Sequence, residues 1–183
     1  MAKNFGKITS TSASINECKT CPANYTLYEI DSNKTCLKYG KRGKLSSAVS
    51  TCAKDGAQPP LPKNAKENAD LLTFFNSNRA RTQNNFALDL NDVKTEGSFV
   101  NSMGEKVNFT NWHGAEPDNK NGTQNFVVMW NDGTWNDYEG NLSTAVIICQ
   151  IDCLVGKLSL SFLIRYFLLM LSNYSTSDIE NDI

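Results

Sequence analysis

Residues 111–137 read NWHGAEPDNKNGTQNFVVMWNDGTWND. Within this stretch, Glu116 and Asp118 flank Pro117, and Asn136 and Asp137 directly follow a tryptophan. Carboxylate and amide oxygens are the ligands that calcium prefers. A cis peptide bond before the proline costs little and would turn both carboxylates toward one ion. Each motif alone also fits an ordinary acidic turn, but their combination favours a calcium site built from two segments.

Short apolar segments flank this stretch and predict the strands of a sheet. Residues 86–90, 126–130 and 145–149 each have the length and composition of a buried or half-buried strand. The polar residues 91–125 are too many for an ordinary connection, and loops of this length are usually functional or disordered. The acidic motifs within it favour a functional loop.

The first half of the chain predicts a hairpin and two helices. The aromatic and β-branched residues between Cys21 and Cys36 fit a strand or hairpin closed by a disulfide. Apolar residues at helical spacing predict a helix over residues 44–55, ending at Gly56. A second helix should begin after Asn64, because Glu67 follows three residues later as in a capping box.

Six cysteines indicate disulfides, although two alternatives remain open. Cysteines stand at 18, 21, 36, 52, 149 and 153, and two of them lie far from the other four, which suits long-range crosslinks. The first two form a CxxC, but a second close pair for zinc and a βαβ pattern for a redox site are both missing. We therefore expect a secreted or extracellular glycoprotein. The sequons starting at Asn24, Asn33, Asn108, Asn121, Asn141 and Asn173 agree, although the first residues lack the apolar stretch of a signal peptide.

Composition favours a single soluble domain and excludes some classes of function. A chain of 183 residues is long enough for one well-buried core and too short for two ordinary ones. The net charge of −1 gives no overall bias toward nucleic acid, so we expect no nucleic-acid partner. His113 is the only histidine, and nothing places a nucleophile beside it, so we expect no enzyme.

In this order along the chain, the motifs resemble the C-type lectin domain family. The resemblance rests on Cys21 and Cys36, Cys52, Asn111-Trp112, Glu116-Pro117-Asp118, Gly133 to Asp137 and Ile148-Cys149. It covers residues 18–153 and implies the long form of an α+β fold, with two helices, two small antiparallel sheets and a long loop region. It also implies the disulfides Cys21–Cys36 and Cys52–Cys149. We infer Cys18–Cys153 for the remaining pair.

The resemblance implies a set of calcium and sugar ligands, with one exchange. The family's mannose-type pattern is Glu-Pro-Asn with a later glutamate, and its galactose-type pattern is Gln-Pro-Asp with that glutamate. This chain has Glu-Pro-Asp, and Gln124 stands where the later glutamate is expected, so the charge of the set is unchanged. The expected calcium ligands are Glu116, Asp118, Gln124, Asn136 and Asp137, and the expected sugar-binding residues are Glu116, Asp118, Gln124 and Asn136.

The exchange leaves two functions open. In this family, two vicinal sugar hydroxyls coordinate the calcium, and each donates to one carboxylate and accepts from one amide. A sugar hydroxyl that contacted both Glu116 and Asp118 would have two carboxylate acceptors beside it but only one proton to donate. The first function is a calcium-dependent carbohydrate-binding domain whose glycan, mannose-type or galactose-type, is unresolved. The alternative is a protein-binding module on the same fold without sugar recognition.

A second departure from the family concerns a disulfide. Phe126 and Gly140 stand where the family has its second internal disulfide. A crosslink of this span stabilises by about 2–4 kcal/mol. We therefore expect a softer loop region unless packing of Phe126 compensates.

Both ends of the chain differ from the domain in character. We expect residues 1–17 to be an N-terminal extension without order, and residues 154–183 to be a short apolar tail with a polar end that is not part of the domain. The apolar stretch from Leu158 to Leu171 is shorter than the roughly 20 residues of a bilayer span, and Arg165 interrupts it. We expect no membrane association through this tail.

Overall fold

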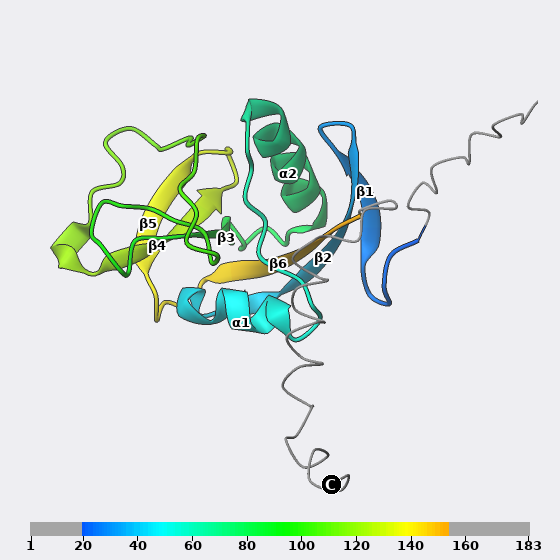
Figure 1. Cartoon of the computed structure of the whole chain (residues 1–183), viewed down its shortest axis with the longest axis horizontal. Coiled ribbons are helices and arrows are strands. Elements are labelled where there is room, and N and C mark those ends of the chain that lie inside the picture. Colours follow the sequence, from blue (N-terminus) through cyan, green and yellow to red (C-terminus); the bar gives the residue numbers. More distant parts are fainter. Residues whose placement is uncertain (1–19, 154–183) are drawn as a thin grey trace, which may run out of the picture. The chain divides into compact units, whose positions relative to one another are not determined.

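The computed structural model describes residues 20–153, and Figure 1 shows how their helices and strands are arranged. The expected extension of residues 1–17 and the expected tail of residues 154–183 lie outside the described residues. The predicted strands at 86–90, 126–130 and 145–149 are confirmed as β3, β4 and β6. The elements are, in chain order, β1 (Thr26–Ile30), β2 (Asn33–Gly43), η1 (Leu45–Ser47), α1 (Ala48–Ala53), α2 (Ala65–Asn78), β3 (Asn85–Asn91), η2 (Lys120–Gly122), β4 (Gln124–Trp130), β5 (Trp135–Glu139) and β6 (Ala145–Asp152).

The strands form one mixed sheet in the order β1-β2-β6-β3-β4-β5. Its two antiparallel halves, β1-β2-β6 and β3-β4-β5, meet where β6 and β3 run parallel and Phe86 pairs with Val146. The expectation of two separate small sheets is therefore wrong. The reason lies in β6, whose residues Ala145–Cys149 are all buried. A continuous apolar run of this kind suits a central strand that has neighbours on both edges.

Both predicted helices are confirmed, with local adjustments at their ends. The helix expected over residues 44–55 consists of the 3-10 turn η1 followed by the short helix α1. In α2, the Asn64 side chain accepts a hydrogen bond from the Glu67 backbone N–H at 2.9 Å, as the predicted cap requires. The Glu67 carboxylate reaches back to the backbone N–H of Lys63 at 2.8 Å. This bond lies one residue earlier than in the standard capping box.

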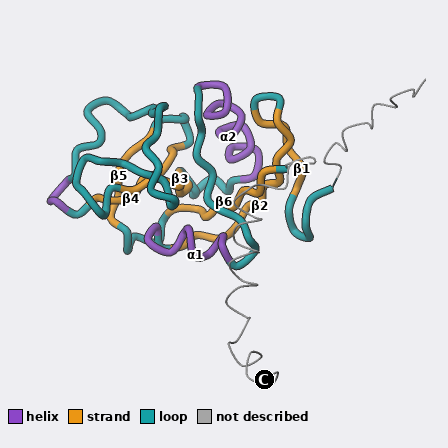
Figure 2. Tube along the Cα trace, viewed as in Figure 1, coloured by secondary structure: helices purple, strands orange, loops and turns teal. Residues whose placement is uncertain are grey.

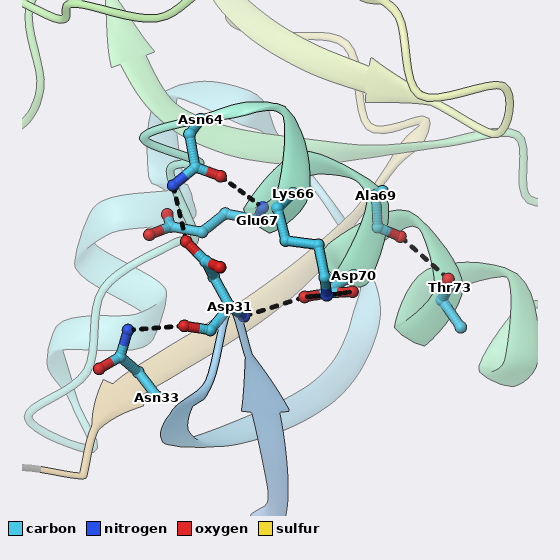
Figure 3. A network of polar contacts seen from close by, with 8 residues as sticks. All are labelled: Asp31, Asn33, Asn64, Lys66, Glu67, Ala69, Asp70 and Thr73. Carbon is cyan, nitrogen blue, oxygen red and sulfur yellow. Dashed lines mark hydrogen bonds and ion pairs between the residues drawn. The ribbon is translucent and has the colours of Figure 1, made fainter.

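The β1–β2 turn is attached to the start of α2 by a polar network (Figure 3). The Asn64 side chain donates to the Asp31 carboxylate at 2.9 Å, and the Asp31 backbone N–H donates to Asp70 at 2.9 Å. Lys66 forms an ion pair with Asp70 one helical turn away. The N-terminal hairpin is therefore attached to α2 by hydrogen bonds as well as by apolar packing.

Two disulfides cross-link the described residues. Cys21 pairs with Cys36 across the hairpin, and Cys52 of α1 pairs with Cys149 of β6. Both pairs match those that the resemblance implies. Cys18 lies outside the described residues, so its pairing with Cys153 stays a prediction.

The apolar core lies between α2 and the sheet, and a second cluster lies between α1 and the sheet. Trp135 is completely buried in the first cluster, and its indole N–H donates to the Asn68 side chain at 2.8 Å. Phe126 packs against the second cluster. A Cβ atom on Gly140 would lie 2.4 Å from Cε2 of Phe126, so the ring covers this glycine where the family has its disulfide. Whether this packing offsets the missing crosslink is a matter of stability, which the Gly140→Ala prediction below addresses.

A long stretch without regular helix or strand connects β3 to η2 and lies beside β4 and β5 (Figure 2). It includes both residues of the Asn111-Trp112 motif and the Glu116-Pro117-Asp118 motif. No helix within residues 20–153 is long and apolar enough to cross a bilayer.

Candidate metal site

The long loop is fixed to β3 by a buried carboxylate. Asp89 is 3% exposed and accepts hydrogen bonds from the Ser102 backbone N–H at 3.1 Å and hydroxyl at 2.8 Å. Burial raises the pKa of Asp89, and the two bonds from Ser102 oppose this shift. The backbone groups of Asn91 and Val100 also pair in both directions. The first part of the loop therefore returns to β3 before the chain reaches its acidic motif.

The next part of the loop runs beside β5. It thereby brings the Glu116-Pro117-Asp118 motif close to the Trp135-Asn136-Asp137 motif. Trp112 and Trp135 form a parallel bridge, in which the Trp135 N–H donates to the Asn111 carbonyl at 2.8 Å. The His113 N–H donates to the Trp135 carbonyl at 2.9 Å. Because this segment is paired with the start of β5, Glu116, three residues after His113, also lies beside β5.

Glu116, on the long loop, contacts the side-chain amide of Asn136 on β5. The Glu116-Pro117 peptide bond is cis. One carboxylate oxygen of Glu116 accepts from the Asn136 side-chain amide at 2.7 Å, and the other accepts from the Asp118 backbone N–H at 3.1 Å. The two motifs that the sequence placed 20 residues apart are thus in direct contact.

Asp137 is completely buried and is the innermost acid of the site. One of its carboxylate oxygens accepts from the Asp118 backbone N–H at 3.2 Å, and the other accepts from the Asn119 N–H at 2.9 Å. These bonds hold the backbone after Pro117 against β5.

Three carboxylates converge at this point without a basic partner. One carboxylate oxygen each of Glu116, Asp118 and Asp137 lies within 4.8 Å of the others. The pKa of Glu116 is raised above its ordinary value by burial first, then by a hydrogen bond with Asp137 and by the charge of Asp118. No ion pair within residues 20–153 involves any of these acids. The arrangement lacks the positive charge that close carboxylates ordinarily require.

The Asn136 side chain supplies a further unsatisfied group. Its amide nitrogen is bonded to Glu116, whereas its carbonyl oxygen is buried and has no hydrogen-bond partner. A buried polar atom without a partner costs about 1–3 kcal/mol. An unpartnered oxygen beside these carboxylates is chemically suited to bind a cation.

Gln124, the fifth expected ligand, lies beside Asp118. The Lys120 backbone N–H donates both to the Gln124 side-chain oxygen at 2.6 Å and to an Asp118 carboxylate oxygen at 3.1 Å. Because both oxygens accept from one nitrogen, they are close neighbours. The structure therefore places all five expected ligands in one region, with Glu116 beside Asn136 and Asp118 beside Gln124.

Asn119 has a positioning role that the sequence motifs did not indicate. Its backbone N–H donates to Asp137, and its side-chain oxygen accepts from the Gln124 backbone N–H at 3.1 Å. Its φ of 42° lies in the left-handed region, which asparagine adopts more readily than most residues. The Pro-Asp-Asn sequence contains this turn signal, but it does not reveal which acid the turn would face.

The chain resembles known proteins over most of the described residues. The family profile described as "Lectin C-type domain" matches residues 41–151. The chain is 34% identical over 99 residues to bovine (Bos taurus) pulmonary surfactant-associated protein D; this match covers 54% of this chain and 26% of that protein. The chain thus spans about a quarter of the length of this relative.

Solved structures share the fold at low sequence identity. C-type lectin CEL-I from Cucumaria echinata has a TM-score of 0.65 at 20% identity, covering 74% of this chain and 100% of that one. The cow C-type carbohydrate-recognition domain of CD23, solved in the presence of an oligosaccharide, has a TM-score of 0.63 at 22% identity, covering 75% and 99%. With the profile match over most of the chain, the disulfides and the fold, these findings show that the chain belongs to the C-type lectin domain family.

Proposed function

We propose that this chain binds carbohydrate through a calcium ion held by Glu116, Asp118, Gln124, Asn136 and Asp137. The observation that carries the proposal is the buried carbonyl oxygen of Asn136, which has no partner and lies beside three carboxylates. Burial of an unpaired oxygen and of close like charges opposes folding, and a bound cation would offset both costs.

The donor set fits calcium. All five side chains offer oxygen, and neither nitrogen nor sulfur ligands are among them. Calcium binds oxygens at about 2.3–2.6 Å, so two oxygens on one ion can be up to about 5 Å apart. The carboxylate oxygens lie within 4.8 Å of one another and meet this condition. Magnesium usually keeps several waters and is seldom held by an all-protein cage of this kind.

The side-by-side arrangement of the ligands supports sugar binding. A bound calcium ion would coordinate two vicinal hydroxyls of a sugar ring. Glu116 beside Asn136 offers one hydroxyl a carboxylate acceptor and an amide donor, and Asp118 beside Gln124 offers the second hydroxyl the same combination. With these pairs, neither hydroxyl has to face two carboxylates. The exchange of Asp118 and Gln124 would then preserve one donor and one acceptor for each hydroxyl.

Vicinal hydroxyls of mannose-type and galactose-type glycans both fit these pairs. Residues 119–121 contain no aromatic ring that could stack on the apolar face of galactose. Asn121 is exposed and begins a sequon next to the site, so an attached glycan would crowd it. Occupancy of Asn121, which glycopeptide mass spectrometry would measure, would favour the protein-binding alternative.

We further propose that residues 18–153 form the lectin domain of a secreted or extracellular protein. The two disulfides agree with an oxidising compartment. The described asparagines of the sequons Asn24, Asn33, Asn108, Asn121 and Asn141 are all exposed, as acceptors of glycans must be.

Calorimetric titration of the full chain with calcium, followed by mannose or galactose, tests the proposal. Glu116→Gln removes one ligand charge with little change of shape and should weaken calcium binding strongly. Glu105→Gln is the matched control, because Glu105 is an exposed acid of the same loop outside the ligand set, and it should leave calcium binding unchanged.

The outcomes separate the two functions. Saturable calcium binding followed by heat from a sugar supports the lectin. Calcium binding without sugar heat would favour a protein-binding module on the same fold. Equal calcium binding by Glu116→Gln and the unsubstituted chain would show that the ligand assignment is wrong.

A further inference from the structure

Although the net charge of the chain is near zero, basic residues are concentrated in two segments outside the candidate metal site. Residues 32–54 contain Lys34, Lys38, Lys41, Arg42, Lys44 and Lys54 and no acid, and residues 71–88 contain Arg79 and Arg81 and no acid. The first segment covers β2, η1 and α1, and the second covers the end of α2 and its connection to β3. Neither segment contributes a residue to the candidate metal site.

Specific contacts bring these two segments together. The Arg42 guanidinium donates to the Thr82 carbonyl, and the Arg79 guanidinium donates to the Gln83 carbonyl at 3.1 Å. The Tyr39 hydroxyl donates to the Gln83 side chain at 2.8 Å. Burial raises the pKa of Tyr39, and the charges of Arg79 and Arg42 act against this shift, so both guanidinium groups are near the phenol. Two arginines are thus fixed on adjacent carbonyls of one connection.

Some of these cations form no ion pair with an acid among the described residues. The ion pairs that the structure shows within residues 20–153 are Lys38–Asp55 and Lys66–Asp70. We define the basic surface as Lys41, Arg42, Lys44, Arg79 and Arg81; four of these side chains are exposed, and Arg79 is half-buried. A guanidinium has five N–H donors, and the described bonds use two of them in Arg79 and one in Arg42. The remaining donors can meet an anion in a two-pronged geometry.

We propose that the basic surface binds a sulfated polysaccharide independently of calcium. Repeated anionic groups along a polysaccharide would complement unpaired cations held by two neighbouring segments. Stacking of nucleic-acid bases needs an open aromatic platform, and Tyr39 instead packs on Phe75 and is hydrogen-bonded to Gln83. Insertion into a membrane needs exposed apolar side chains, and the large exposed ones in the described chain (Val49, Val93, Met103 and Leu142) are not members of the surface.

Binding of the full chain to immobilised heparin in the presence of chelator tests this inference. We expect saturable binding at 0.15 M NaCl that weakens steeply as salt is raised. For four engaged cations the slope of log affinity against log salt should be about −3, by analogy with single-stranded polyanions. Because chelator is present throughout, failure of the proposed calcium site would leave this result unchanged.

Two double variants of equal charge separate a defined surface from overall charge. Lys41→Gln with Arg81→Gln should weaken heparin binding about tenfold and reduce the salt slope by about half. Neither side chain makes a hydrogen bond or ion pair in the described structure, so melting temperature should be unchanged. Lys94→Gln with Lys106→Gln removes the same charge from the long loop and should change affinity less than twofold.

Three results would overturn the inference. The first is no saturable heparin binding at 0.15 M NaCl. The second is equal weakening by the two double variants, which would show that binding follows overall charge. The third is tighter binding to a single-stranded oligonucleotide or to phosphatidylserine vesicles than to heparin, which would assign the surface to another class of partner.

Discussion

Replacing Gly140 by alanine should destabilise the β4–β5 hairpin, which carries three of the five proposed ligands. The added Cβ would lie 2.4 Å from Cε2 and 2.8 Å from Cδ2 of Phe126, and 3.2 Å from Cβ of Ser46. Carbon atoms prefer separations of about 3.5–4.0 Å, so the ring would have to move by more than about 1 Å. Gly140 is not among the residues with positive φ, so the main obstacle to alanine is the Phe126 ring, and Ser46 adds a smaller one.

The expected cost follows from this overlap. Overpacking of a well-filled region costs about 1–3 kcal/mol. At about 4 °C per kcal/mol for a domain of this size, the melting temperature should fall by roughly 4–12 °C. Phe126→Ala removes the ring, so in that background Gly140→Ala should cost less than about 0.5 kcal/mol. The difference between the two backgrounds measures the clash.

Thermal unfolding of the four proteins of this cycle, followed by circular dichroism with chelator present, checks the prediction. Chelator keeps differences in calcium binding out of the comparison. An equal cost of Gly140→Ala in both backgrounds would refute the reasoning, because the penalty would then not come from Phe126. A neutral effect in the native background would show that the ring does not fill the position of the missing disulfide.

Three further predictions concern the core and the site. Asn68→Ala should cost about 1–3 kcal/mol in a urea titration, because it leaves the buried Trp135 indole N–H without its acceptor; an unchanged midpoint would contradict this. Calcium at 100 times its dissociation constant should raise the free energy of unfolding by about 2.7 kcal/mol, and a melting temperature unaffected by chelator would count against the site. The raised pKa of Glu116 means that, without calcium, its contribution to stability is present below its ordinary value of 4.5 and is lost as pH rises through the raised value. Calcium needs the carboxylate form, so affinity measured by calorimetry should fall as pH is lowered through that raised pKa, and a pH-independent affinity would contradict the role of Glu116.

Local features of the fold could be predicted from the sequence because their causes are local. The cap at Asn64 depends on residues within one helical turn, and the structure shows the expected bond to Glu67. The pairs Cys21–Cys36 and Cys52–Cys149 followed from the resemblance to the family. The joining of the two sheet halves depends on one long-range pair, Phe86 with Val146, and no local pattern encodes it.

The sequence predicted which side chains would lie near one another at the candidate site, but not which of them contact each other. The two motifs identified Glu116, Asp118, Asn136 and Asp137 by chemistry alone. The contact between Glu116 and Asn136 depends on how the loop runs beside β5, and that path is set by backbone bonds between Asn111, His113 and Trp135 that join segments more than 20 residues apart. The net charge of the chain does not indicate the basic surface, because it sums the charges of residues that the fold places in separate regions.

The position of β5 explains how half of the candidate site is held in place. Trp135 is buried in the core, and its indole is held by Asn68, which also donates to the Gly133 carbonyl at 3.0 Å. The next two residues, Asn136 and Asp137, therefore take their positions from the core rather than from the loop. Glu116 and Asp118 lie on the loop and depend on bonds to Asp137 and Asn136 for their positions. If calcium binds here, the entropy of ordering is lost mainly in the loop, and the carboxylate and amide of β5 act as a preformed half of the site.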